Sequence, residues 1–102
     1  MHLIEIFLPL NRRDGTPQPA DRLGELRREL VDRFGGLTAF TRAPAEGLWA
    51  DESDRIERDR IVIFEVMADD IDRGWWNALR ERLERELDQE EVLIRASAVE
   101  RL

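Results

Sequence analysis

Residues 60–68, Arg-Ile-Val-Ile-Phe-Glu-Val-Met-Ala, are the stretch that decides the fold of this 102-residue chain. Their β-branched and aromatic side chains favour a strand, and a short apolar run is typical of a strand buried on both faces. Successive side chains of a strand point to opposite sides. The two sides here carry Val62, Phe64 and Val66, and Ile61, Ile63, Glu65 and Met67.

Further strands and a helix are predicted on either side of this stretch. Residues 2–8, 37–43 and 92–99 alternate with the period of a strand. Residues 20–34 place apolar side chains three to four positions apart, the spacing of one helix face. Gly35 then supplies the left-handed residue that commonly ends a helix.

A second helix is predicted between residues 60–68 and the last strand. Asp69 and Asp70 are both suitable N-caps, and this helix should run to about residue 88. Its apolar stripe contains the adjacent Trp75 and Trp76, which differ by about 100° around a helix. We therefore expect one tryptophan in the core and the other at its margin or in an interface.

This order of elements predicts a single α+β domain over residues 1–102, of the ferredoxin-like βαββαβ type. Right-handed crossovers place both helices on one face of a four-stranded antiparallel sheet, in the order 4-1-3-2. The other face is then uncovered. Pro44 and Gly47 predict that residues 45–51 form an irregular connection or a short edge hairpin, with a mobile polar tip at residues 51–55.

The composition excludes several kinds of chemistry. The chain has no cysteine and no lysine, so it forms no disulfide, zinc-thiolate cluster, cysteine nucleophile or lysine Schiff base. Its only histidine, His2, lies beside the first methionine, which disfavours a Ser-His-Asp triad. The acidic residues 51–54 are interpreted as a solvated loop, so we expect no metal and no cofactor.

Charge and hydropathy limit the partners. With 16 basic and 23 acidic side chains the formal net charge is −7, which opposes binding to nucleic acid. Residues 1–9 are too short and too acidic for a membrane span or signal peptide. We expect a cytoplasmic protein with no membrane partner.

The uncovered face of the sheet is the first candidate site. If the more continuously apolar set of each strand faces the helices, the uncovered face is apolar with charges at mid-strand. Glu5 can pair there with Arg95 on one side and approach Glu65 on the other. The parity of the second strand stays open: it contributes either Thr38, Phe40 and Arg42, or Leu37, Ala39 and Thr41.

Two interpretations of this face follow. In the first, two copies stack their uncovered faces and bury these charges as ion pairs, which gives a homodimer. In the second, the covered space keeps a pocket in which a desolvated carboxylate acts as a general base.

Residues 34–49 are the second candidate site, because glycines, a proline and charged and aromatic side chains crowd one segment. Trp49 could form an apolar wall, Arg42 an anion clamp, and Glu46 an acceptor or base, which together would hold a small molecule. The alternative is structural: the glycines and Pro44 make turns, and Trp49 covers the core or a partner subunit.

Four segments carry a resemblance: residues 34–38, 42–49, 64–67 and 72–76. They resemble a family of small bacterial proteins of similar length with no assigned activity. Through Gly-Leu-Thr and Gly-x-Trp the chain is also similar to another domain family of unknown function, and its layout resembles the dimeric α/β-barrel superfamily. The resemblance implies a ferredoxin-like homodimer.

That superfamily includes cofactor-independent monooxygenases and haem-degrading enzymes, but the resemblance carries over no catalytic residue. The Asn, Trp and His of the haem-degrading members have no match, since His2 is terminal and Asn77 follows Trp76 in the second helix. We therefore expect a homodimeric binding or assembly module. The alternative is a small cofactor-independent enzyme acting on an organic acid or aromatic molecule near residues 42–49, with Glu65 or Glu46 as base.

Overall fold

The computed structural model describes residues 1–50 and 56–102, without the side chains of residues 42–45, 47, 49–50 and 56–59. Over these residues the chain forms an α+β structure whose elements follow the predicted order. They are β1 (His2–Pro9), α1 (Ala20–Phe34), β2 (Thr38–Ala50), β3 (Ile56–Ala68), α2 (Arg73–Glu86) and β4 (Ile94–Ala98).

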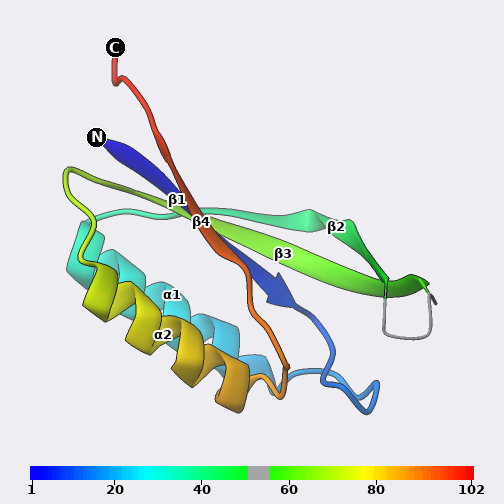
Figure 1. The fold of residues 1–102 in the computed structure, drawn as a ribbon. Coiled ribbons are helices and arrows are strands. Elements are labelled where there is room, and N and C mark those ends of the chain that lie inside the picture. Colours follow the sequence, from blue (N-terminus) through cyan, green and yellow to red (C-terminus); the bar gives the residue numbers. More distant parts are fainter. Residues whose placement is uncertain (51–55) are drawn as a thin grey trace.

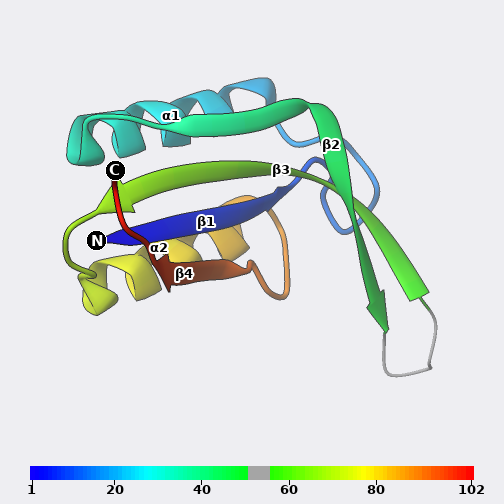
Figure 2. The same ribbon diagram turned by 90° about the horizontal axis from the view of Figure 1, so that it is seen from above.

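The strands form one antiparallel sheet, and both helices lie against the same face of it (Figure 1). The strand order is β2-β3-β1-β4, which reads 4-1-3-2 from the β4 edge, so each strand has the neighbours that the sequence predicts. Figure 2 shows β2 and β4 at the two edges, with β3 and β1 between them.

The core lies between the sheet and the helices. Its buried side chains come from alternate residues of β1 and β3 and from the apolar stripes of α1 and α2. They include Ile4, Ile6, Leu8, Val62, Phe64, Val66, Leu26, Leu30, Trp76, Leu79 and Leu83. Side-chain alternation in β1 and β3 is therefore confirmed, although Ile61, from the opposite set of β3, is buried as well.

β2 and β3 form a longer hairpin than the predicted strands at residues 37–43 and 60–68. The pairing shifts between Phe40, which lies opposite Ile63, and Ala45, which lies opposite Ile61. The extra residues form an irregularity that accommodates Pro44, since proline cannot donate to a regular ladder and is tolerated at bulges of edge strands. The predicted tip at residues 51–55 lies outside the described residues.

The helix ends follow local chemistry. Gly35 has φ +80° and ends α1 as predicted. The prediction of Asp69 or Asp70 as cap of α2 is wrong: Asp72 is the N-cap, and its Oδ1 accepts a hydrogen bond from the Trp75 N–H at 3.1 Å. Residues 69–70 form a bend, and Ile71 packs against the core, so the helix begins only after it.

Two further sequence expectations concern the tryptophans and β4. Trp76 is buried, while Trp75 is half-buried and meets it edge-on, with ring centroids 4.8 Å apart. The division of the pair between core and margin is thus confirmed. The strand predicted at residues 92–99 is shorter in the structure, Ile94–Ala98, and its Ala96 and Ala98 are exposed, with Ala96 beside a cleft that borders α2.

Candidate functional site

The face of the sheet opposite the helices, called here the open face, is rich in apolar side chains that the chain itself covers incompletely. Phe40 is 51% exposed, Met67 43% and Leu93 39%. Phe7 and Ile63 are half-buried. Grouped exposed apolar side chains of this kind are typical of a surface that another molecule covers.

A line of charged side chains crosses the middle of the open face. Glu5 on β1 lies opposite Glu65 on β3 and opposite Arg95 on β4. Arg95 Nε donates to Glu5 Oε1 at 2.9 Å, and its guanidinium lies 4.8 Å from the centroid of the Phe7 ring. The predicted pairing of Glu5 with Arg95 and its proximity to Glu65 are both confirmed.

Glu65 differs from Glu5 in having no ion pair within the described part of the chain, although its side chain is half-buried. Its neighbour on β2 is Thr38. Cross-strand neighbours share a face, so Thr38 and Phe40 lie on the open face, which settles the parity of the first part of β2.

The irregularity in β2 contains Thr41 and Arg42. Thr41 is half-buried, and the side chain of Arg42 lies outside the described residues. A pair between Arg42 and Glu65 therefore stays a prediction.

The remaining predicted site residues lie further along the hairpin. Glu46 is exposed and pairs in register with Arg60, and the backbone of Trp49 pairs with Glu57. Glu65 lies five positions after Arg60, which is roughly 17 Å along a strand. The register thus keeps Glu46 away from Glu65. A cleft between Arg42 and Trp49 stays a prediction, because the side chains of Arg42 and Trp49 lie outside the described residues.

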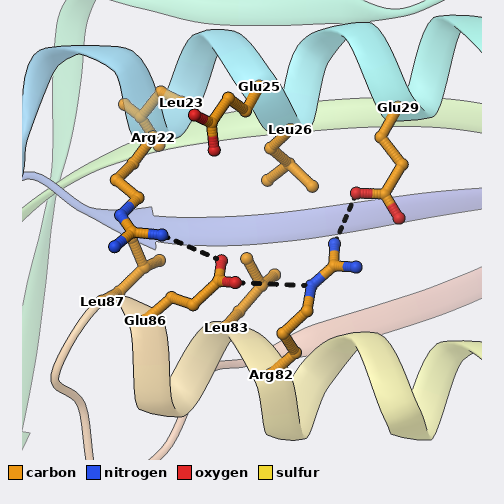
Figure 3. A pocket seen from close by; sticks show the side chains of 9 residues that line it. All are labelled: Arg22, Leu23, Glu25, Leu26, Glu29, Arg82, Leu83, Glu86 and Leu87. Atoms are coloured by element: carbon orange, nitrogen blue, oxygen red, sulfur yellow. Dashed lines mark hydrogen bonds and ion pairs between the residues drawn. The ribbon is translucent and has the colours of Figure 1, made fainter.

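A cleft of about 170 Å³ lies between the two helices, on the side away from the sheet (Figure 3). Its polar side chains form a chain of ion pairs in which Arg82 bridges Glu29 and Glu86, and Arg22 reaches Glu86 at 3.8 Å. The hydrogen bond to Glu29 raises the pKa of Arg82 above its ordinary value. The pairs Arg82–Glu29 and Arg22–Glu86 connect α1 to α2, whereas Arg82–Glu86 lies within α2. Each of these partly exposed pairs is worth about 0.2–1 kcal/mol, so we interpret the cleft as structural.

Another cleft, of about 220 Å³, lies between α2 and the edge strand β4. Arg73, Asn77 and Arg80 line it from one face of α2, and Trp76 and Ile94 provide apolar walls. Arg80 also pairs with Glu84 at 3.1 Å. Sequence reasoning missed this cleft, although the i, i+4, i+7 spacing of the three polar residues was a signal for it.

Within the described residues no group of three or more His, Asp or Glu side chains is placed to hold a metal ion. Nor does any helix in the same part of the chain have the length and hydropathy needed to cross a membrane.

No protein-family model and no curated protein matches the chain. A search of solved structures finds similarity to a phage SAM lyase in complex with S-methyl-5′-thioadenosine, with a TM-score of 0.63. The match covers 94% of this chain and 79% of the lyase chain, at 17% sequence identity. The two proteins are thus alike in fold, and this chain has the architecture of a known small α/β fold.

Proposed function

We propose that this protein is a homodimeric binding and assembly module of the ferredoxin-like type, whose two copies pair through their open faces. The observation that carries the proposal is the charge line of the open face. Across β3, β1 and β4 it reads Glu65, Glu5, Arg95, and its half-buried Glu65 lacks an ion pair among the described residues.

The two ends of this line, Glu65 and Arg95, are complementary under a two-fold rotation. The two Glu5 carboxylates face each other at the axis, and each keeps its hydrogen bond from Arg95 of its own chain. In this arrangement the two sheets stack face to face, and the two-fold axis lies between them, parallel to β1 and above Glu5. The rotation places β3 of one copy over β4 of the other. Arg95 of each copy would then lie over Glu65 of its mate. Stacked sheets are about 10 Å apart, a gap that an arginine and a glutamate side chain span together.

The apolar side chains around the charge line supply the attraction. Phe40, Met67 and Leu93 keep large exposed fractions in the single chain, and burying apolar surface contributes about 25 cal/mol per Å². The charge line in their midst fixes the register, because a shifted pairing would leave carboxylates buried without a cation.

A charge exchange tests the pairing. Arg95→Glu would place a carboxylate over Glu65 of the mate, and Glu65→Arg would place two guanidinium groups together, so each change should weaken the dimer at least about tenfold. The double variant restores the pattern with reversed signs and should recover most of the affinity. Arg28→Glu, on the exposed side of α1, serves as the control of equal charge change.

Light scattering coupled to size exclusion, over a range of protein concentrations, measures the dimer. Wild-type protein that stays monomeric at high micromolar concentration would contradict the proposal. So would single variants that dimerise as well as the wild type.

A second candidate is a small cofactor-independent enzyme that acts on an organic acid or aromatic molecule near Arg42 and Trp49. The similarity in fold to a SAM lyase that holds S-methyl-5′-thioadenosine favours it. Titration calorimetry with S-methyl-5′-thioadenosine as the probe tests this candidate. Binding that Arg42→Ala or Trp49→Ala abolishes would support it, and a flat titration would argue against this class of ligand.

A further inference from the structure

The outer edge of β4 carries backbone groups that the sheet leaves unpaired. β4 is an edge strand, and its bonds to β1 include Phe7 N–H to the Leu93 carbonyl and Val99 N–H to the Met1 carbonyl, both 3.0 Å. Because alternate residues of an antiparallel strand bond to the same neighbour, the odd-numbered residues of β4 face β1. The N–H and C=O groups of residues 94, 96 and 98 therefore point outward.

The cleft beside α2 runs along this same edge. The side chains of Ile94 and Ala96 line it, and both belong to residues whose backbone groups point outward. Paired residues of antiparallel strands share a face. In a strand added at this edge, the residues that hydrogen-bond to β4 would therefore point their side chains into the cleft.

The cleft is basic, in a chain with a formal net charge of −7. Arg73 lies exposed at the first position of α2 and makes no ion pair with any residue that the structure describes. Arg80 lies two turns further along the same helix face and donates a hydrogen bond to Glu84. The Glu84 carboxylate also accepts a hydrogen bond from the Val92 N–H at 2.9 Å, so it is shared between the two donors. An incoming carboxylate would therefore meet an unneutralised guanidinium next to an amide donor, Asn77.

We propose that the β4 edge and this cleft bind an extended acidic peptide, which adds to the sheet as an antiparallel strand with its acidic side chains between Arg73 and Arg80. Strand addition of this kind derives affinity from main-chain hydrogen bonds and specificity from alternate side chains. The opposite side chains of the peptide would extend the apolar open face next to Leu93.

The charges select this occupant over a second copy of the chain. Two β4 edges paired with each other would bring the arginines of both copies together, and like charges at an edge are a known protection against self-pairing. A free anion would satisfy the arginines and leave the outward N–H and C=O groups of β4 without partners.

Fluorescence anisotropy with a labelled, end-blocked peptide of about six alternating glutamate and valine residues, the usual length of a strand, tests the proposal. Arg73→Glu should weaken binding at least about tenfold, because it replaces a charge-assisted contact by a repulsion. Arg85→Glu, an equal change on an exposed part of the same helix, should leave binding within twofold or so. Thermal unfolding of both variants verifies that they fold.

Backbone methylation separates strand addition from charge attraction. Methylating the amides of the glutamates should abolish binding, since those residues bond to β4, whereas methylating the amides of the valines should not. Equal binding of the two methylated peptides would overturn the proposal. Displacement of the peptide by free glutarate at comparable concentration would also overturn it and assign the cleft to small anions.

Discussion

Replacing a phenylalanine by alanine on each face of the sheet tests the division between core and open face. Phe64 on β3 is fully buried, whereas Phe40 on β2 is 51% exposed. The two side chains are chemically identical and lie on adjacent strands, since Phe40 pairs with Ile63. Any difference between the two variants therefore reports which face each side chain occupies.

The expected magnitudes follow from these exposures. Phe64→Ala removes a fully buried ring and leaves a cavity, which costs about 3–5 kcal/mol. That is a large part of the roughly 5–15 kcal/mol that stabilises a typical domain. Phe40→Ala loses only about half of the transfer free energy and encloses no cavity, so it should cost about 1 kcal/mol in the isolated chain.

Urea unfolding at low and high protein concentration, followed by the fluorescence of the three tryptophans, which include the buried Trp76, measures both effects. The loss from Phe64→Ala should be the same at both concentrations. The loss from Phe40→Ala should grow with concentration, because the wild-type dimer gains stability by mass action and the variant gains less. Equal losses for the two variants at low concentration would refute the assignment of faces, and a wild-type midpoint independent of concentration would refute the dimer.

Other variants test local features by thermal or urea unfolding. Gly35→Ala should cost about 1 kcal/mol, because φ is +80° there while a Cβ meets nothing within 4 Å, and Gly36→Ala, with open space and no positive φ, should be near neutral. Asp72→Ala removes the cap of α2 and should cost about 0.5–2 kcal/mol. A hydrogen bond from Arg13 lowers the pKa of Asp88 below its ordinary 3.8, so this pair stabilises the fold above that pH and is lost as pH falls through the lowered value. Asp88→Asn, which tolerates the φ of 54° at this position, should therefore show less acid destabilisation than the wild type below pH 3.8.

The parts of the fold that the sequence predicts are those controlled by periodicity. Alternation in residues 60–68 separates Phe64, which is fully buried, from Glu65, which lies on the open face. The same parity argument predicts the pair between Glu5 and Arg95, because cross-strand neighbours follow once the strand order is known.

The parts that the sequence does not predict depend on contacts between distant segments. The start of α2 is set by the packing of Ile71 against the core, and no local signal distinguishes Asp72 from Asp69 and Asp70. The cleft beside β4 requires knowing that Arg73 and the edge of β4 lie next to each other, although they are about 20 residues apart in the sequence.

The two proposed surfaces do not compete for the same atoms. Stacking of open faces uses side chains that point away from the helices, whereas strand addition uses the outward backbone groups of β4 and the helix side of its edge. A dimer built on the charge line keeps both β4 edges accessible, so it would present two peptide sites on one particle. Linked acidic segments would then bind the dimer more tightly than the monomer, by an amount set by their spacing. Glu65→Arg should reduce this gain while leaving the affinity for a single peptide nearly unchanged, because Glu65 lies on β3 and is not among the residues that line the cleft beside β4.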